Sequence, residues 1–210
     1  MKSPVHTLAA IALAGAVLLS GGAAWAAASE DPDWPCIQRL MPEISPATVW
    51  GGPPLDDAAG AWRDTPAIRD LVVRTADRRT APGEAERDIA AFAGTLKSGE
   101  KNAALTLLFA GVWETLNDRR RAMIERIKAF ARQQRARAER IEQKLLVIDR
   151  ISADTSAAGR ARTEEFRQDL ALEVRIFEDR EKAIRYLCDL PVKVEGALGA
   201  LARVISAQLD

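Results

Sequence analysis

Residues 101–152 read KNAALTLLFAGVWETLNDRRRAMIERIKAFARQQRARAERIEQKLLVIDRIS. Apolar side chains recur every three or four positions, which is the spacing of one face of an α-helix. They are Leu105, Leu108, Val112, Leu116, Met123, Ile127, Phe130, Ile141, Leu145 and Ile148. No proline interrupts the stretch, and its only glycine, Gly111, costs about 1 kcal/mol in a helix. A straight helix over this range would be roughly 75 Å long. It is too long for a compact bundle, so part of it must be two-stranded or bent.

A second long helix is predicted further along the chain. After a break at residues 153–159, apolar positions again follow helical spacing from about residue 162 to residue 190. They are Phe166, Leu170, Val174, Phe177, Ile184 and Leu187. Proline begins helices far more readily than it continues them. A last helix is therefore expected to start at Pro191, capped by Asp189, and to bury Val194, Leu198, Leu201 and Ile205.

The charge pattern predicts that the two long helices form an antiparallel hairpin. Residues 119–140 contain nine basic and two acidic residues, whereas residues 163–181 contain seven acidic residues and three arginines. A fold-back near residue 156 places residue i opposite about residue 312 − i, with Arg135 beside Phe177. Exposed ion pairs contribute only a few tenths of a kcal/mol each, but many of them favour this register.

Shorter elements precede the hairpin. Thr65 and Pro66 suit the start of a helix. Another helix is expected from Pro82 to about Ser98-Gly99. Residues 29–64, by contrast, form an extended arm rich in proline, glycine and tryptophan. The expected fold class is all-α: a long, bundle- or coiled-coil-like antiparallel hairpin with additional packed helices, forming a helical domain at 65–210, and the arm laid against it.

Residues 1–28 have the composition of a secretory signal peptide. Lys2 precedes an apolar core, and small residues allow cleavage after Ala26 or Ala28. The alternative is an uncleaved membrane anchor, since the uncharged segment is long enough to cross a bilayer. We expect a periplasmic or otherwise exported chain that is soluble, with no membrane span, after cleavage.

Two cysteines, Cys36 and Cys188, are present in the whole chain. An exported protein meets an oxidising compartment, so we predict a structural disulfide that fastens the arm to the second long helix. An intermolecular bridge and a redox-active pair are the alternatives. A redox pair is disfavoured because dithiol oxidoreductases hold their cysteines two residues apart.

The composition argues against several kinds of chemistry. Cleavage would remove His6, the only histidine, and with it the usual base of serine and cysteine hydrolases. It would also leave 29 basic and 30 acidic residues, which gives no overall field to attract nucleic acid. We expect no cofactor, no metal site and no catalytic residues.

Two groups of side chains are candidates for binding a partner. Arg119, Arg120 and Arg121 form either a docking patch for an acidic protein or a solvated surface neutralised by the acidic helix. Trp50 and Trp62 either face a partner, around residues 50–54, or attach the arm to its own core.

The resulting expectation is an exported helical accessory, adaptor or chaperone-like factor that binds another envelope protein as a monomer or homodimer. A small-ligand-binding bundle, with a pocket near Phe109 and Trp113, is the alternative. An enzyme that uses only carboxylates is a third reading.

Overall fold

The structure is a computed structural model, and it describes residues 31–210. The predicted signal peptide and both candidate cleavage sites lie outside the described residues. Within residues 31–210 the regular structure is entirely helical, which confirms the all-α fold class. The helices are α1 (Pro66–Thr75), α2 (Pro82–Gly94), α3 (Ser98–Ile151) and α4 (Ala157–Ser206), preceded by two short 3-10 helices at Pro46–Thr48 and Ala61–Asp64.

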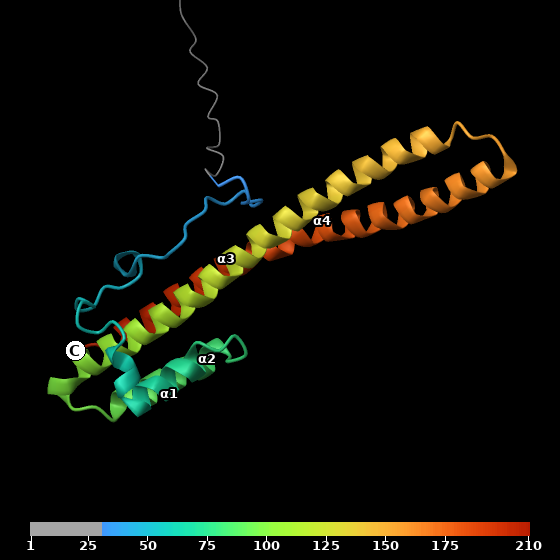
Figure 1. Cartoon of the computed structure of the whole chain (residues 1–210). Coiled ribbons are helices and arrows are strands. Elements are labelled where there is room, and N and C mark those ends of the chain that lie inside the picture. The colour runs from blue at the N-terminus through green and yellow to red at the C-terminus, as the bar shows by residue number, and fades with distance from the viewer. Residues whose placement is uncertain (1–30) are drawn as a thin grey trace, which may run out of the picture.

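The helices α3 and α4 form a long antiparallel hairpin (Figure 1). The turn between them is closed by polar side chains. The Asp154 carboxylate accepts the Ser156 N–H, and the Ser156 hydroxyl accepts the Gly159 N–H as the cap of α4. A Cβ at Gly159 would lie 2.3 Å from Cγ of Asp154, so the tight turn requires glycine there.

The register of the hairpin agrees with the one predicted from charge. The Gln134 side chain donates to the Phe177 carbonyl at 3.3 Å, and Lys144 pairs with Asp169 at 2.6 Å. At the base, the Asp210 N–H donates to Oδ1 of Asn102 at 3.0 Å. These contacts are spread over the length of the hairpin, so the two helices stay aligned from the base to near the tip.

The predicted break at Pro191 is wrong, because α4 continues through it to Ser206. Proline removes one backbone hydrogen bond, the one to the carbonyl four residues earlier, and costs about 3 kcal/mol within a helix. Here Pro191 is buried, and the helix is anchored on both sides of it by Cys188 and by the buried Val194. Asp189 lies exposed inside α4 and caps nothing.

The predicted end of the second helix is also wrong, because α2 stops at Gly94 and Ser98 begins α3. Thr95 ends α2, because its hydroxyl donates to the Phe92 carbonyl at 2.7 Å and its N–H donates to the same carbonyl. A serine–glycine pair is compatible with either end of a helix. The residues Ser98-Gly99 therefore did not show whether a helix ends or begins there.

The apolar core lies at the base of the hairpin, where α1 packs on α3 and α2 packs on α1 and α4 (Figure 1). The side chains buried most completely there are Ile68, Leu71, Val72, Ile89, Leu105, Leu108, Phe109, Val112, Leu116, Leu198 and Ile205. We call this part of the molecule, including the arm packed on it, the body. Among residues 31–210, no helix combines the length and the apolar character needed to cross a membrane.

Gly111 lets α1 and the arm approach α3 closely. A Cβ there would lie 2.6 Å from Cγ2 of Val72 and 2.8 Å from Cδ2 of Trp62. We expect Gly111→Ala to lower the free energy of unfolding by about 1–2 kcal/mol, because the overpacking exceeds the gain in helix propensity. Urea unfolding measures the change.

Gly196→Ala is the matched control, because nothing lies within 4 Å of a Cβ at that exposed position of α4. It should raise the free energy of unfolding by about 0.5–1 kcal/mol. Equal effects of the two substitutions would contradict the close approach at Gly111.

Candidate functional site

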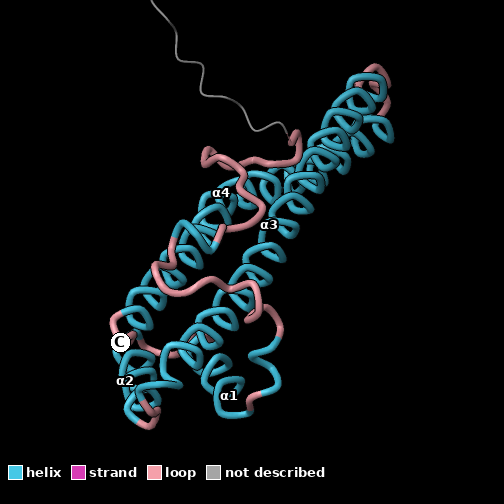
Figure 2. Tube along the Cα trace, turned by 90° about the vertical axis from the view of Figure 1, so that its left-hand side faces the viewer, coloured by secondary structure: helices cyan, strands magenta, loops and turns pink. Residues whose placement is uncertain are grey.

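The arm is joined covalently to the hairpin. Cys36 and Cys188 form a disulfide within the chain, with an S–S distance of 2.03 Å, and no free cysteine remains within residues 31–210. The predicted disulfide between Cys36 and Cys188 is therefore present within the chain, in place of the alternative bridge between two chains. The bond attaches the arm to α4 at Cys188. Figure 2 shows the arm lying along the hairpin.

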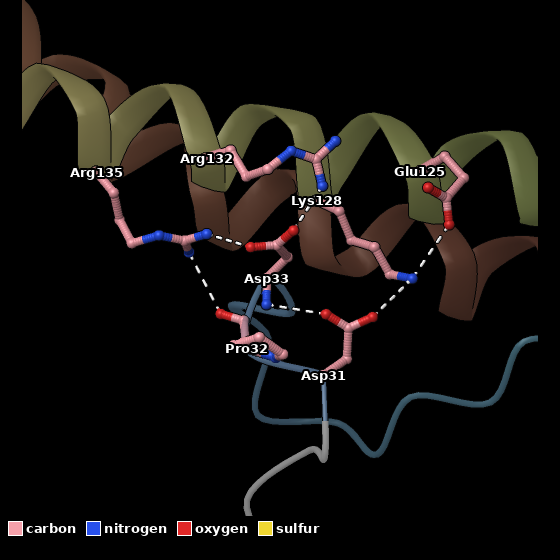
Figure 3. A network of polar contacts seen from close by, with 7 residues as sticks. All are labelled: Asp31, Pro32, Asp33, Glu125, Lys128, Arg132 and Arg135. Carbon is pink, nitrogen blue, oxygen red and sulfur yellow. Dashed lines mark hydrogen bonds and ion pairs between the residues drawn. The ribbon is translucent and has the colours of Figure 1, made fainter.

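Next to the disulfide, two carboxylates of the arm bind basic side chains of α3 (Figure 3). Asp31 accepts from Lys128 at 2.9 Å, and Asp33 accepts from Arg132 at 2.6 Å and also pairs with Arg135. The Asp33 N–H donates to Asp31 at 2.9 Å, which orients the two carboxylates together. We call these five residues the arm clip.

The arm clip changes the expected charge balance of the hairpin. Part of the basic segment of α3 faces the arm rather than the acidic segment of α4. The hydrogen bond from Lys128 lowers the pKa of Asp31, and the one from Arg132 lowers the pKa of Asp33. The Asp31 carboxylate in turn raises the pKa of Lys128. Both aspartates belong to the arm, which the charge comparison of the two helices did not include.

The arm clip should weaken in acid. The pKa values of Asp31 and Asp33 are lowered from 3.8, so their contribution to stability is complete above that pH and is lost as the pH falls through the folded-state values. We expect the double variant Asp31→Asn/Asp33→Asn to melt below the wild type at pH 7. The difference should shrink as the pH falls below 3.8 and vanish once the pH is below the lowered folded-state pKa values of Asp31 and Asp33.

Melting curves recorded by circular dichroism at several pH values test this expectation. The control is Asp56→Asn/Asp57→Asn, which changes two exposed aspartates of the same arm. A melting difference for the Asp31/Asp33 variant that persists unchanged at pH 2.5 would show that the ion pairs are not its origin.

The three consecutive arginines do not form one surface. Arg119 donates to the Ala76 carbonyl at the end of α1, and Arg121 is exposed and pairs with Asp118 one turn earlier. Arg120 is only 5% exposed, donates to the Met41 carbonyl of the arm and lies 3.9 Å from Glu195 of α4. Arg120 is therefore part of neither the predicted docking patch nor the predicted solvated surface, because its side chain is buried.

Arg120 links the arm, α3 and α4 from a buried position. Burial lowers its pKa, and the nearby Glu195 carboxylate opposes that shift. The sequence contains a signal for this placement, because Arg120 follows Leu116 and precedes Ile124 at helical spacing on the buried stripe. An arginine at a buried position needs acceptors within the protein, because burying an unpaired charge is costly.

Arg120→Ala should lower the free energy of unfolding by about 2 kcal/mol, because it leaves the Met41 carbonyl without its charged donor and removes a buried side chain. Arg121→Ala should change it by less than about 0.5 kcal/mol, since the Arg121–Asp118 pair is exposed. Chemical denaturation of both variants measures the contrast. Equally small effects would mean that Arg120 does not hold the arm.

The tryptophans attach the arm to the body. Trp62 is buried and donates to Glu114 at 2.9 Å, and the same carboxylate accepts the Gly60 N–H at 2.7 Å and pairs with Arg63. Burial of Glu114 would raise its pKa, but these hydrogen bonds lower it overall. Trp62 therefore does not face a partner, contrary to one of the two predicted roles.

Trp50 fills the region where the sequence suggested a small-ligand pocket. Its ring stacks on Phe109 with centroids 4.1 Å apart and an interplanar angle of 4°. Its N–H donates to the Pro53 carbonyl at 2.8 Å. Nearby, the Trp113 N–H donates to the Ile44 carbonyl at 2.8 Å. These rings join the arm to α3 and occupy the space beside Phe109.

Beyond the disulfide and the arm clip, the hairpin continues as two helices alone (Figure 1). We call residues 136–180 the distal hairpin. Its buried residues are few compared with those of the body: Ile148, Gly159, Thr163 and Leu170. The seam combines half-buried apolar side chains, such as Ile141, Phe166 and Phe177, with ion pairs. Glu173 accepts from Lys144 at 2.5 Å, which lowers the pKa of Glu173. The hydrogen bond to Asp169, followed by the one to Glu173, raises the pKa of Lys144.

Large apolar side chains remain in water on the distal hairpin. Leu145 and Leu146 of α3 are 52% and 47% exposed, and Leu172 and Ile176 of α4 are 59% and 39% exposed. Only Leu145 belongs to the apolar stripes predicted from the sequence. The other three residues lie outside those stripes. Their positions off the buried face were the sequence signal that could have predicted their exposure.

Comparisons with known proteins find no family model, no curated protein and no solved structure that matches this chain.

Proposed function

We propose that the protein is an exported, non-catalytic adaptor or chaperone-like factor that binds another envelope protein through its distal hairpin. The observation that carries the proposal is the contrast between the two halves of the molecule. The body has α1, α2 and the arm packed on the hairpin, whereas in the distal hairpin Leu145, Leu146, Leu172 and Ile176 are exposed on two helices alone. Other exposed apolar side chains lie outside the distal hairpin: Ile37, Met41, Val73, Tyr186, Leu190 and Val192. What distinguishes the distal hairpin is the lack of a third layer, which leaves its exposed apolar residues available for contact with another protein.

The shape of the distal hairpin supports binding to a protein rather than to a small molecule. A small ligand requires a concave site that covers most of its surface. Two helices side by side offer long open flanks, which suit an amphipathic helix or another extended partner. The ion pairs of Lys144 with Asp169 and Glu173 help to keep the two helices in register.

Export is supported by the composition of residues 1–28 and by the disulfide. A bond between residues 152 positions apart forms and persists in an oxidising compartment. The body is then fastened by Cys36 and Cys188, so the distal hairpin extends from a rigid base. An adaptor of this kind needs no reactive group of its own, because it acts by contact alone.

The proposal is tested by crosslinking tagged protein in intact cells and comparing variants. Leu172→Gln/Ile176→Gln removes two apolar side chains one turn apart on α4 and should abolish the crosslinked partner. Val73→Gln is the control, because Val73 is 63% exposed but lies on α1 in the body. Each variant should retain its helicity, and each exposed substitution should change stability by no more than about 0.5 kcal/mol.

The expected result is a crosslinked band that is present in the wild type and in Val73→Gln and absent in the double variant. Mass spectrometry of that band identifies the partner. Equal retention by all three proteins would contradict binding through the distal hairpin.

A further inference from the structure

The arm begins with a compact acidic turn that lies on α3 (Figure 3). The Trp34 N–H donates to the Asp31 carbonyl at 3.1 Å, and the Asp33 N–H donates to the Asp31 carboxylate at 2.9 Å. Aspartate is favoured at the first position of such a turn, and proline, here Pro32, at the second. The turn therefore holds two carboxylates close together in one defined arrangement. We call residues 31–34 the arm turn.

Three cations of α3 match the polar groups of the arm turn. Lys128 binds the first carboxylate at 2.9 Å, and Arg132 binds the second at 2.6 Å. Arg135 pairs with the second carboxylate and also donates to the Pro32 carbonyl at 3.3 Å. Charged donors thus meet both carboxylates and the carbonyl between them, which is a recognition pattern for an acidic motif. We call Lys128, Arg132 and Arg135 the basic site.

The basic site is short, because acidic side chains lie at both of its ends. Lys128 is shared with Glu125, one turn earlier on α3, at 3.1 Å. Glu139 follows Arg135 by one turn on the same side of the helix. These two carboxylates would repel a long polyanion, such as a strand of nucleic acid, beyond the three cations. The site therefore fits a compact turn with two carboxylates.

The arm turn can leave the basic site while the rest of the arm stays attached. It precedes Cys36, and the chain that follows is held by the disulfide and by Ile44, whose N–H and carbonyl both bond to the Asn117 side chain. About half of the side-chain surface of Arg132 and of Arg135 remains exposed beside the turn. Exposed ion pairs are individually weak, so a competing acidic segment can displace the turn.

We infer that the basic site binds an acidic turn of another protein, with two carboxylates on either side of one residue as in Asp-Pro-Asp, and that the arm turn is its built-in competitor. The partner's carboxylates take the places of those of Asp31 and Asp33, and its intervening carbonyl accepts from Arg135. The arm turn lowers the apparent affinity for the partner in proportion to the fraction of molecules in which the site is closed.

This inference concerns a different surface from the proposed function and does not depend on it. The basic site lies on α3 before the distal hairpin, and it recognises charge rather than apolar side chains. Loss of the crosslinked partner after substitution of Leu172 and Ile176 reports on the distal hairpin. Binding of an acidic peptide reports on the basic site, so either inference can fail while the other holds.

Fluorescence anisotropy of a labelled peptide with the sequence of residues 29–35, SEDPDWP, measures binding to the purified, oxidised protein at low salt. Asp31→Asn/Asp33→Asn, which we call the open variant, should bind the peptide about tenfold more tightly than the wild type, because its uncharged turn competes less. Asp56→Asn/Asp57→Asn makes the same change of net charge at exposed positions of the arm, and should bind as the wild type does.

The decisive comparison removes cations from the open variant. Added Arg132→Gln/Arg135→Gln should abolish peptide binding, whereas added Arg126→Gln/Arg150→Gln, at exposed positions of α3 outside the basic site, should leave it unchanged. Circular dichroism verifies that each variant keeps its helices. No binding to the open variant, equal affinity of the open variant and the wild type, or binding that survives Arg132→Gln/Arg135→Gln would each overturn the inference. Equal binding of a peptide with asparagine in place of both aspartates would also overturn it.

Discussion

A pair of helices can bury only the stripes that face each other, and this constraint governs the whole molecule. Where a third layer covers the hairpin, long apolar side chains such as Leu108, Phe109 and Leu198 are completely buried. Where that layer ends, the seam contains half-buried apolar side chains together with ion pairs such as Lys144–Glu173, and several leucines remain in water. The length of α3 and α4 therefore creates both a stable base and a segment that offers its surface to other molecules.

The arm provides much of the third layer, although it contains almost no regular structure. It is fastened along its course by different interactions: the arm clip, the disulfide, the Arg120–Met41 hydrogen bond and the rings of Trp50 and Trp62. In the chain-entropy description, closing a loop of this size by a disulfide contributes roughly 5 kcal/mol. An extended segment without helical hydrogen bonds depends on such contacts to remain in place.

The large features of the fold could be predicted because they depend on patterns that extend over many residues. The apolar spacing of residues 101–152 indicated α3, and the opposite charges of two segments indicated the register. The pairing of Cys36 with Cys188 followed from there being two cysteines. Local features decided by tertiary packing were not predicted correctly. Pro191 stays helical because the surroundings of α4 hold it, and Arg120 is buried because the arm supplies an acceptor.

The candidate surfaces were harder to predict than the fold. Runs of arginine and clusters of tryptophan attract notice in a sequence, yet in this chain most of them serve the attachment of the arm. The surface now proposed on the distal hairpin consists of ordinary residues, such as Leu172, whose significance depends on the absence of a covering element in the described structure. The absence of a covering element cannot be deduced from the sequence pattern alone, because it depends on which elements pack against α4.

The central claim, that the distal hairpin lacks the support given to the body, is tested most directly by hydrogen exchange of dilute, oxidised protein followed by mass spectrometry. Amides in residues 136–180 should exchange much faster than those in residues 100–131 and 188–205, because local opening of two unsupported helices costs less free energy than opening of the core. Equal protection of the distal hairpin and the body in dilute protein would contradict the account.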